Sequence, residues 1–143
     1  MPKIKDYNFP KHNFEKFQPN PSWTGKGRYM HEDCSIRAVC AATGKTWEEV
    51  YDILCVSGKQ VFDAPTSDES VERALTNMGY TKHSVKVVKG SKRPTPSSLT
   101  RENPDKRLVM RVSGHFVGGR NGKYYDCWDC GTKGIYTYYQ KAN

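Results

Sequence analysis

A cysteine, a histidine and an aspartate stand out because their types and settings fit nucleophilic catalysis by a thiol. Cys34 follows Asp33 at the start of a helical pattern, which places the thiol in the first turn, among unpaired backbone N–H groups. The positive end of the helix dipole stabilises a thiolate there. An imidazole base and a carboxylate that orients it would complete such a catalyst, and both are expected far from the cysteine in sequence.

The imidazole and the carboxylate lie on a predicted β-hairpin near the C-terminus. Asn121-Gly122 is a strong signal for a two-residue turn, and apolar and aromatic residues flank it. Counting outward from this turn puts His115 on the same face as Asp126 and Trp128, whereas Asp129 points to the other face. Asp126 is therefore the predicted partner of His115, and Trp128 could shield the pair from water. A β-bulge in the first strand would reverse this parity and favour Asp129.

The elements that must position these residues follow from the hydrophobic periodicity. Apolar residues at helical spacing, Asp33 as the N-cap and Gly44 as the stop residue predict the cysteine helix. A capping box at Thr46 and a similar start at Thr66 open two more amphipathic helices. The period changes to two from residue 82 on. The sequence thus predicts helices over 34–43, 46–54 and 66–78, strands over 83–88, 108–112, the two hairpin arms and 135–139, and a long polar loop over 89–105.

Helices that precede strands predict an α+β domain with an antiparallel sheet. The length of 143 residues fits one domain over 26–143, preceded by an extended arm over 1–25. Prolines argue against a helix in the arm, and its aromatic residues indicate that it packs on the domain; these are Phe9, Phe14, Phe17 and Trp23. With no apolar run of about 18 residues and no signal peptide, a cytoplasmic protein with five reduced cysteines is expected.

Three motifs together carry a resemblance to a known family. They are Asp-Cys-Ser-Ile-Arg-Ala from Asp33, Ala-Thr-Gly-Lys-Thr-Trp-Glu-Glu-Val-Tyr from Ala42, and the Gly-His that ends at His115. A cysteine that starts a helix, a Gly-His on a strand and an aspartate on the next strand resemble the papain-like cysteine peptidase fold, and more narrowly its small bacterial and phage members. The resemblance runs from about Asp33 to the C-terminus.

The resemblance implies a Cys-His-Asp triad that hydrolyses an amide bond in a protein or peptide, with no cofactor. Cys34 would be the nucleophile and its backbone N–H an oxyanion donor, His115 the general base and acid, and Asp126 the group that orients the imidazole. In papain relatives a glutamine shortly before the cysteine is the second oxyanion donor. Residues 28–33 contain no glutamine, so this donor is unassigned. Substrate-binding candidates are His31, Asp33 and Trp128.

Charge supports a second hypothesis of a different class. The net charge is +8, and residues 82–107 hold eight Lys or Arg against two acids, a net of +6. A catalytically idle papain-like domain could bind nucleic acid or a protein partner through this basic segment. No nucleic-acid motif accompanies the charge, so a solvated surface segment is the favoured interpretation. The same triad could also serve deamidation or acyl transfer.

The remaining cysteines and histidines have less specific settings. Cys127 and Cys130 form a Cys-x-x-Cys pair, but a zinc site needs four ligands and no second pair has metal spacing. No helical pattern follows the motif, as thioredoxin-like chemistry would require. We expect two packed or partly exposed thiols and no metal. Cys40 and Cys55 are expected to be inert helix residues, and no role is assigned to His12 or His83.

Overall fold

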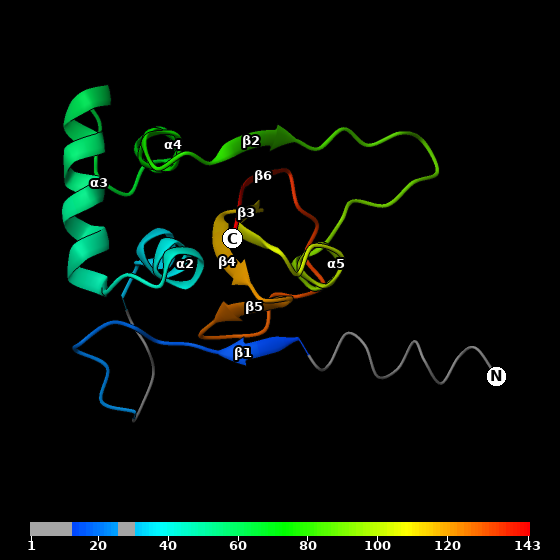
Figure 1. Cartoon of the computed structure of the whole chain (residues 1–143), viewed down its shortest axis with the longest axis horizontal. Helices are drawn as coiled ribbons and strands as arrows, with labels where there is room; N and C mark the ends of the chain where they lie inside the picture. The colour runs from blue at the N-terminus through cyan, green and yellow to red at the C-terminus, as the bar shows by residue number, and fades with distance from the viewer. Residues whose placement is uncertain (1–12, 26–30) are drawn as a thin grey trace.

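The computed structural model describes residues 13–25 and 31–143 and shows an α+β fold, with helices on both sides of one β-sheet (Figure 1). The elements within these residues are, in chain order, β1 (Phe14–Lys16), α2 (Cys34–Thr43), α3 (Trp47–Val61), α4 (Asp68–Asn77), β2 (Thr81–Ser84), α5 (Pro96–Glu102), β3 (Lys106–Val112), β4 (His115–Arg120), β5 (Lys123–Asp126) and β6 (Thr137–Ala142).

The three predicted helices form, and their ends follow from local capping. Gly44 ends α2 in the left-handed conformation, with φ of 77°. The predicted capping box at Thr46 starts α3, where the Thr46 hydroxyl accepts from the Glu49 backbone and the Glu49 carboxylate accepts from the Thr46 backbone. The helix continues past the predicted end at Leu54 to Val61, because its next turn also packs inward. Ser67 caps α4.

The six strands of the described residues form a mixed sheet in the order β1-β5-β4-β3-β6-β2. The expectation of an antiparallel sheet is wrong at one edge, because β1 pairs with β5 in parallel. The other neighbouring strands pair antiparallel. A strand of three residues is too short to show a period of two, which explains why β1 has no sequence signal.

Each face of the sheet carries its own hydrophobic core. One core joins the sheet to α2, α3 and α4, and the other lies on the face that α5 covers. Figure 1 shows these two layers on opposite sides of the strands. The alternation predicted for β3 is confirmed, since Leu108, Met110 and Val112 lie in the second core and Val109 lies in the first.

The predicted loop over 89–105 is wrong in its second half, which forms α5. Pro96 occupies the first turn of that helix. Thr95 and Ser98 form a capping box, in which the Thr95 hydroxyl accepts from the Ser98 backbone and the Ser98 hydroxyl accepts from the Thr95 backbone. Leu99 is buried, so this half of the segment is not solvated. The flanking strands are also shifted from 83–88 to 81–84 and from 135–139 to 137–142.

The described part of the arm supplies β1, the strand at one edge of the sheet. The Phe14 ring lies 5.4 Å from the Tyr124 ring, and the Phe17 ring lies 5.9 Å from the Tyr125 ring. The Phe17 backbone N–H donates to the Asp126 carbonyl and continues the pairing of β1 with β5. Phe9, His12 and residues 26–30 lie outside the described residues. None of the described helices has the length and apolar character needed to cross a bilayer.

Candidate active site

Cys34 is the first residue of α2 and is half-buried. Asp33 occupies the N-cap position as expected, but its side chain makes no capping hydrogen bond. Its carboxylate instead accepts from the side chains of Arg37, Trp47 and Asn20. The thiol therefore has the predicted place in the first turn, where unpaired backbone N–H groups and the helix dipole favour its anionic form.

His115 and Asp126 are brought together by the hairpin of β4 and β5. The turn residues Asn121 and Gly122 have φ of 54° and 76°, as a type I′ turn requires. The predicted register is confirmed for the three pairs next to the turn, which end at Gly118 and Tyr125. Just beyond the ladder, His115 Nε2 lies 2.5 Å from Asp126 Oδ2.

Asp129 does not contact His115 and has its own structural partners. Its Oδ1 atom accepts from the Tyr124 hydroxyl at 2.6 Å and from the Gly131 backbone at 2.9 Å. Trp128, the predicted shield, lies with its ring centroid 5.0 Å from that of His115 and is 45% exposed. The parity argument from the turn thus identified the aspartate that contacts His115.

The three groups shift one another's protonation toward an ion pair. Burial raises the pKa of the Cys34 thiol, but a hydrogen bond with His115, a backbone hydrogen bond at Phe116 and the nearby positive charges outweigh it, so the pKa is lowered overall. Burial lowers the pKa of His115, whereas hydrogen bonds to Asp126 and Cys34 raise it to about 9. Since Nε2 faces Asp126, Nδ1 is left for the thiol.

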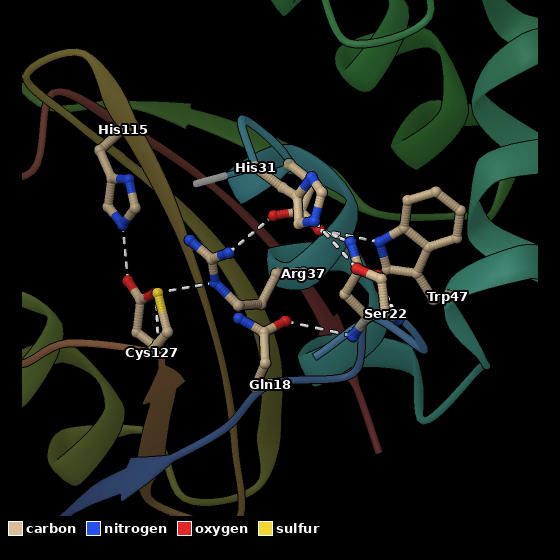
Figure 2. Close-up of polar contacts among 10 residues, drawn as sticks. Gln18, Ser22, His31, Arg37, Trp47, His115 and Cys127 are labelled. Atoms are coloured by element: carbon tan, nitrogen blue, oxygen red, sulfur yellow. Dashed lines mark hydrogen bonds and ion pairs between the residues drawn. The ribbon is translucent and has the colours of Figure 1, made fainter. Parts of the chain in front are cut away.

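Arg37, which sequence analysis did not select, lies behind this cluster. It is 4% exposed, and its Nε donates to Asp126 Oδ1 while Nη1 donates to Asp33 Oδ1, both at 2.9 Å. Asp33 Oδ2 in turn accepts from Trp47 Nε1 and Asn20 Nδ2. The dashed lines in Figure 2 follow this network from His115 through Arg37 to Trp47. The sequence does contain a signal for a special role of Arg37. It is the one charged residue in the helix Cys34–Thr43, whose pattern is apolar on nearly every side.

A cavity of about 670 Å³ opens in front of Cys34 and contains all three substrate-binding candidates. His31 is exposed, with Nε2 2.9 Å from the Ser22 hydroxyl, and Trp128 also forms part of the cavity wall. Asp33 is buried and bonded within the protein, so its side chain supports the wall. The lining residues are Lys16, Gln18, Trp23, His31, Glu32, Asp33, Cys34, Arg37, Gly114, His115, Cys127 and Trp128.

Gln18 is the second residue of the site that sequence analysis missed. Its Oε1 accepts from the Asn20 backbone at 3.1 Å, whereas its Nε2 is buried and has no hydrogen-bond partner within the described residues. An unpartnered buried donor in the same cavity as a thiol can donate to the oxygen of a bound carbonyl group. The sequence search considered residues 28–33 only, and Gln18 lies far upstream on the arm.

The Cys-x-x-Cys pair also lies at the site, without the spacing of a complete metal centre. Cys130 is fully buried and its thiol donates to Asp126 Oδ2 at 3.3 Å. The ligand atoms of His115, Asp126 and Cys130 lie within 4.8 Å of one another, and no other such group occurs in the described part of the chain. Burial raises the pKa of Cys130, and Arg37 already places a cation on Asp126, so both features favour a proton-sharing network over a metal site.

Comparisons with known proteins give no relative: no protein-family model, curated protein or solved structure matches this chain.

Proposed function

We propose that this protein is a papain-like cysteine peptidase, or a related thiol-dependent amide-bond hydrolase, with Cys34, His115 and Asp126 as its triad. The observation that carries the proposal is the position of His115, which contacts Asp126 through Nε2, lines the same cavity as Cys34 and lowers the pKa of that thiol. A cysteine-bearing helix packed on a sheet that supplies His and Asp, with a cavity in front of the thiol, supports it.

The proposed mechanism begins from the thiolate–imidazolium pair. The Cys34 sulfur attacks the carbonyl carbon of the substrate, and the C–N bond breaks as the His115 imidazolium gives its proton to the leaving amine. Water then attacks the thioester, with neutral His115 as the base that takes the proton of the water. The C–S bond breaks, which releases the carboxylic acid product and restores the Cys34 thiolate beside the His115 imidazolium. Asp126 keeps the imidazole oriented and stabilises its cation throughout.

We assign the two oxyanion donors to the backbone N–H of Cys34 and to Gln18 Nε2. The backbone donor belongs to the unpaired first turn of α2. Gln18 lines the same cavity and brings the buried amide donor that residues 28–33 do not contain. The arm would therefore supply the glutamine donor that in papain relatives comes from a segment shortly before the cysteine.

The direct test is thiol labelling followed by a substrate screen. With brief, limiting iodoacetamide at neutral pH, mass spectrometry should find Cys34 labelled first, because the pKa values of Cys40, Cys127 and Cys130 are all raised by burial. A peptide library should then be cleaved by the wild-type protein and not by Cys34→Ala. Preferential labelling of Cys127, or equal cleavage by both proteins, would refute the triad.

The Gln18 assignment has its own test. We expect Gln18→Ala to lower kcat by about 10²–10³-fold while Cys34 alkylation stays at the wild-type rate, since the amide acts on the oxyanion and not on the thiol. Lys16→Ala is the matched control, because Lys16 lines the same cavity and is exposed. A Gln18 variant with wild-type kcat would remove the amide from the oxyanion hole.

The binding-domain hypothesis keeps one supporting observation. Lys86, Lys89 and Lys92 are all exposed on the segment between β2 and α5, free to meet an acidic partner. The test is retention of the protein on immobilised nucleic acid as a function of salt concentration. This hypothesis would be favoured if the triple variant Lys86→Gln/Lys89→Gln/Lys92→Gln lost a salt-dependent retention that Cys34→Ala kept, and if the wild-type protein cleaved no peptide. Release of ammonia or acyl transfer in the same screen would identify the other thiol chemistries.

A further inference from the structure

We propose that Arg37 is a positioning residue for the proposed hydrolase: it fixes the Asp126 carboxylate beneath His115 and joins it to the helix that carries Cys34. This role rests on the proposed function and adds a fourth residue to the triad. The evidence lies in the position of Arg37 on the helix, the bonds of its guanidinium group and the charges that surround it.

Arg37 lies three residues after Cys34, so both side chains lie on the same side of α2. A fork-shaped guanidinium can bond two carboxylates at once, and it does so here with Nε on Asp126 and Nη1 on Asp33. Asp33 is itself held by Trp47, near the start of α3. These bonds connect α2, which carries Cys34, to the end of β5, which carries Asp126, next to the proposed reacting groups.

Both carboxylate oxygens of Asp126 have hydrogen-bond partners. Oδ1 accepts from Arg37 at 2.9 Å and from the Cys127 backbone at 2.8 Å, while Oδ2 faces His115 and the Cys130 thiol. The carboxylate plane is thus fixed by contacts on both oxygens. A rotation that moved Oδ2 away from His115 would break the bond to Arg37.

Stability alone does not explain a buried cation at this position. The helix around Arg37 is apolar and buried from Ser35 to Ala42, and an apolar side chain would pack there without burying charge. Replacing a buried ion pair by apolar residues is often neutral or stabilising. The positive charge also favours the Cys34 thiolate, in addition to the contribution from His115.

The test compares Arg37→Met and Arg37→Lys with the wild type, after thermal melts have confirmed folding. Arg107→Met is the matched control, because Arg107 also binds α2, through the carbonyls of Ala42 and Thr43 at its far end. The first readout is the rate of Cys34 alkylation by iodoacetamide as a function of pH, which needs no substrate. The second is kcat on a peptide from the library screen.

At pH 6, we expect alkylation of Cys34 to be about tenfold slower in Arg37→Met than in the wild type, because the whole rate profile moves to higher pH. Arg37→Lys should keep the wild-type alkylation profile and lose kcat, because one ammonium cannot hold both carboxylates in place. Arg107→Met should match the wild type in both readouts. If Arg37→Met does not fold, the double variant Arg37→Met/Asp33→Asn replaces it. In that variant residue 33 carries no buried charge, and Asp126 still has His115 as its partner.

Two failures remain distinguishable. A wild-type thiol that reacts only at the pH of a free cysteine would refute the proposed triad itself. A wild-type thiol that reacts at low pH, together with an unchanged profile and unchanged kcat in Arg37→Met, would overturn the role of Arg37 and leave the triad standing.

Discussion

At the scale of single residues, Asp126 contacts His115 and Arg37 through different carboxylate oxygens. One oxygen faces His115 and the other accepts from Arg37, and the carboxylate is fully buried. Burial raises the pKa of Asp126, but the hydrogen bond to His115 and the charge of Arg37 hold it below its usual range. The carboxylate therefore stays ionised wherever the ion pair of Cys34 and His115 exists.

A comparison of Asp126→Ala with Asp129→Ala tests the choice of the acid. We expect Asp126→Ala to reduce turnover about a hundredfold, because His115 loses its orientation and its counter-charge. Asp129→Ala should leave turnover within about twofold of wild type and cost about 1 kcal/mol of stability, through the lost hydrogen bond of Tyr124. Steady-state kinetics and urea unfolding measure both effects, and the reverse ranking would contradict the observed register.

The protonation states predict a bell-shaped dependence of kcat/KM on pH. Below the lowered pKa of Cys34 the thiol is protonated and cannot attack. Above about 9 the imidazolium of His115 is lost, and with it the acid that protonates the leaving amine. Activity should therefore be retained at neutral pH and decline as the pH rises through about 9. In Asp126→Ala the upper limb should move to lower pH, and a fixed limb would argue against His115 as the acid.

At the scale of elements, the contact of α2 with β4 sets the distance between Cys34 and His115. A Cβ atom added to Gly118 would lie 2.1 Å from the Ala38 carbonyl oxygen and 2.7 Å from the Ala41 Cβ. Glycine is needed here because helix and strand approach so closely. The backbone at Ala38 belongs to the turn that follows Cys34, so any shift of this contact moves the thiol relative to His115.

We accordingly expect Gly118→Ala to cost about 1–3 kcal/mol of stability and to slow Cys34 alkylation at low pH, because α2 must move away from the sheet. Val117→Ala is the matched control. Val117 lies on the same strand but in the core on the other face, so a similar loss of stability of about 2 kcal/mol should leave the alkylation profile unchanged. Equal profiles for the two variants would show that the helix contact does not govern the thiol.

The elements that sequence reasoning found are those with long or highly specific signals. The apolar pattern and Gly44 defined α2, and Asn121-Gly122 determined the hairpin register and with it the partner of His115. The helix α5 has seven residues, too few for a periodic stripe, and its evidence lay in the caps of Thr95 and Pro96. Arg37 required the tertiary contact with Asp126, which local periodicity does not contain.

At the scale of the whole molecule, the candidate site depends on three distant parts of the chain. Cys34 comes from α2, His115 and Asp126 from the hairpin, and Gln18 and Trp23 from the arm before them. The arm was expected to pack on the domain, but its contribution to the cavity depends on a three-residue parallel strand that has no sequence pattern of its own. The contact of His115 with Asp126 was therefore more predictable than the cavity wall.

Asn13 anchors this arm and offers a test of its role. Its Nδ2 donates to the Ser97 carbonyl at 2.7 Å and to the Thr100 hydroxyl at 3.1 Å, its Oδ1 accepts from Ser97 Oγ, and its carbonyl accepts from the Tyr124 backbone. The side chain thus ties the start of β1 to α5. It is 6% exposed, so water does not replace these bonds without local opening.

We expect Asn13→Ala to lower kcat at least tenfold and to cost about 1–3 kcal/mol of stability, because a loosened β1 no longer holds Gln18 in the cavity. Alkylation of Cys34 should stay close to the wild-type rate, since the triad is carried by α2, β4 and β5. Glu15→Ala is the control on the same strand: its side chain makes an exposed ion pair with Lys123 at 3.2 Å, which contributes little. Kinetics and alkylation measured side by side separate the arm from the triad. Loss of both in Asn13→Ala would mean that the arm holds the thiol as well, whereas loss of neither would mean that β1 keeps Gln18 in place without its anchor.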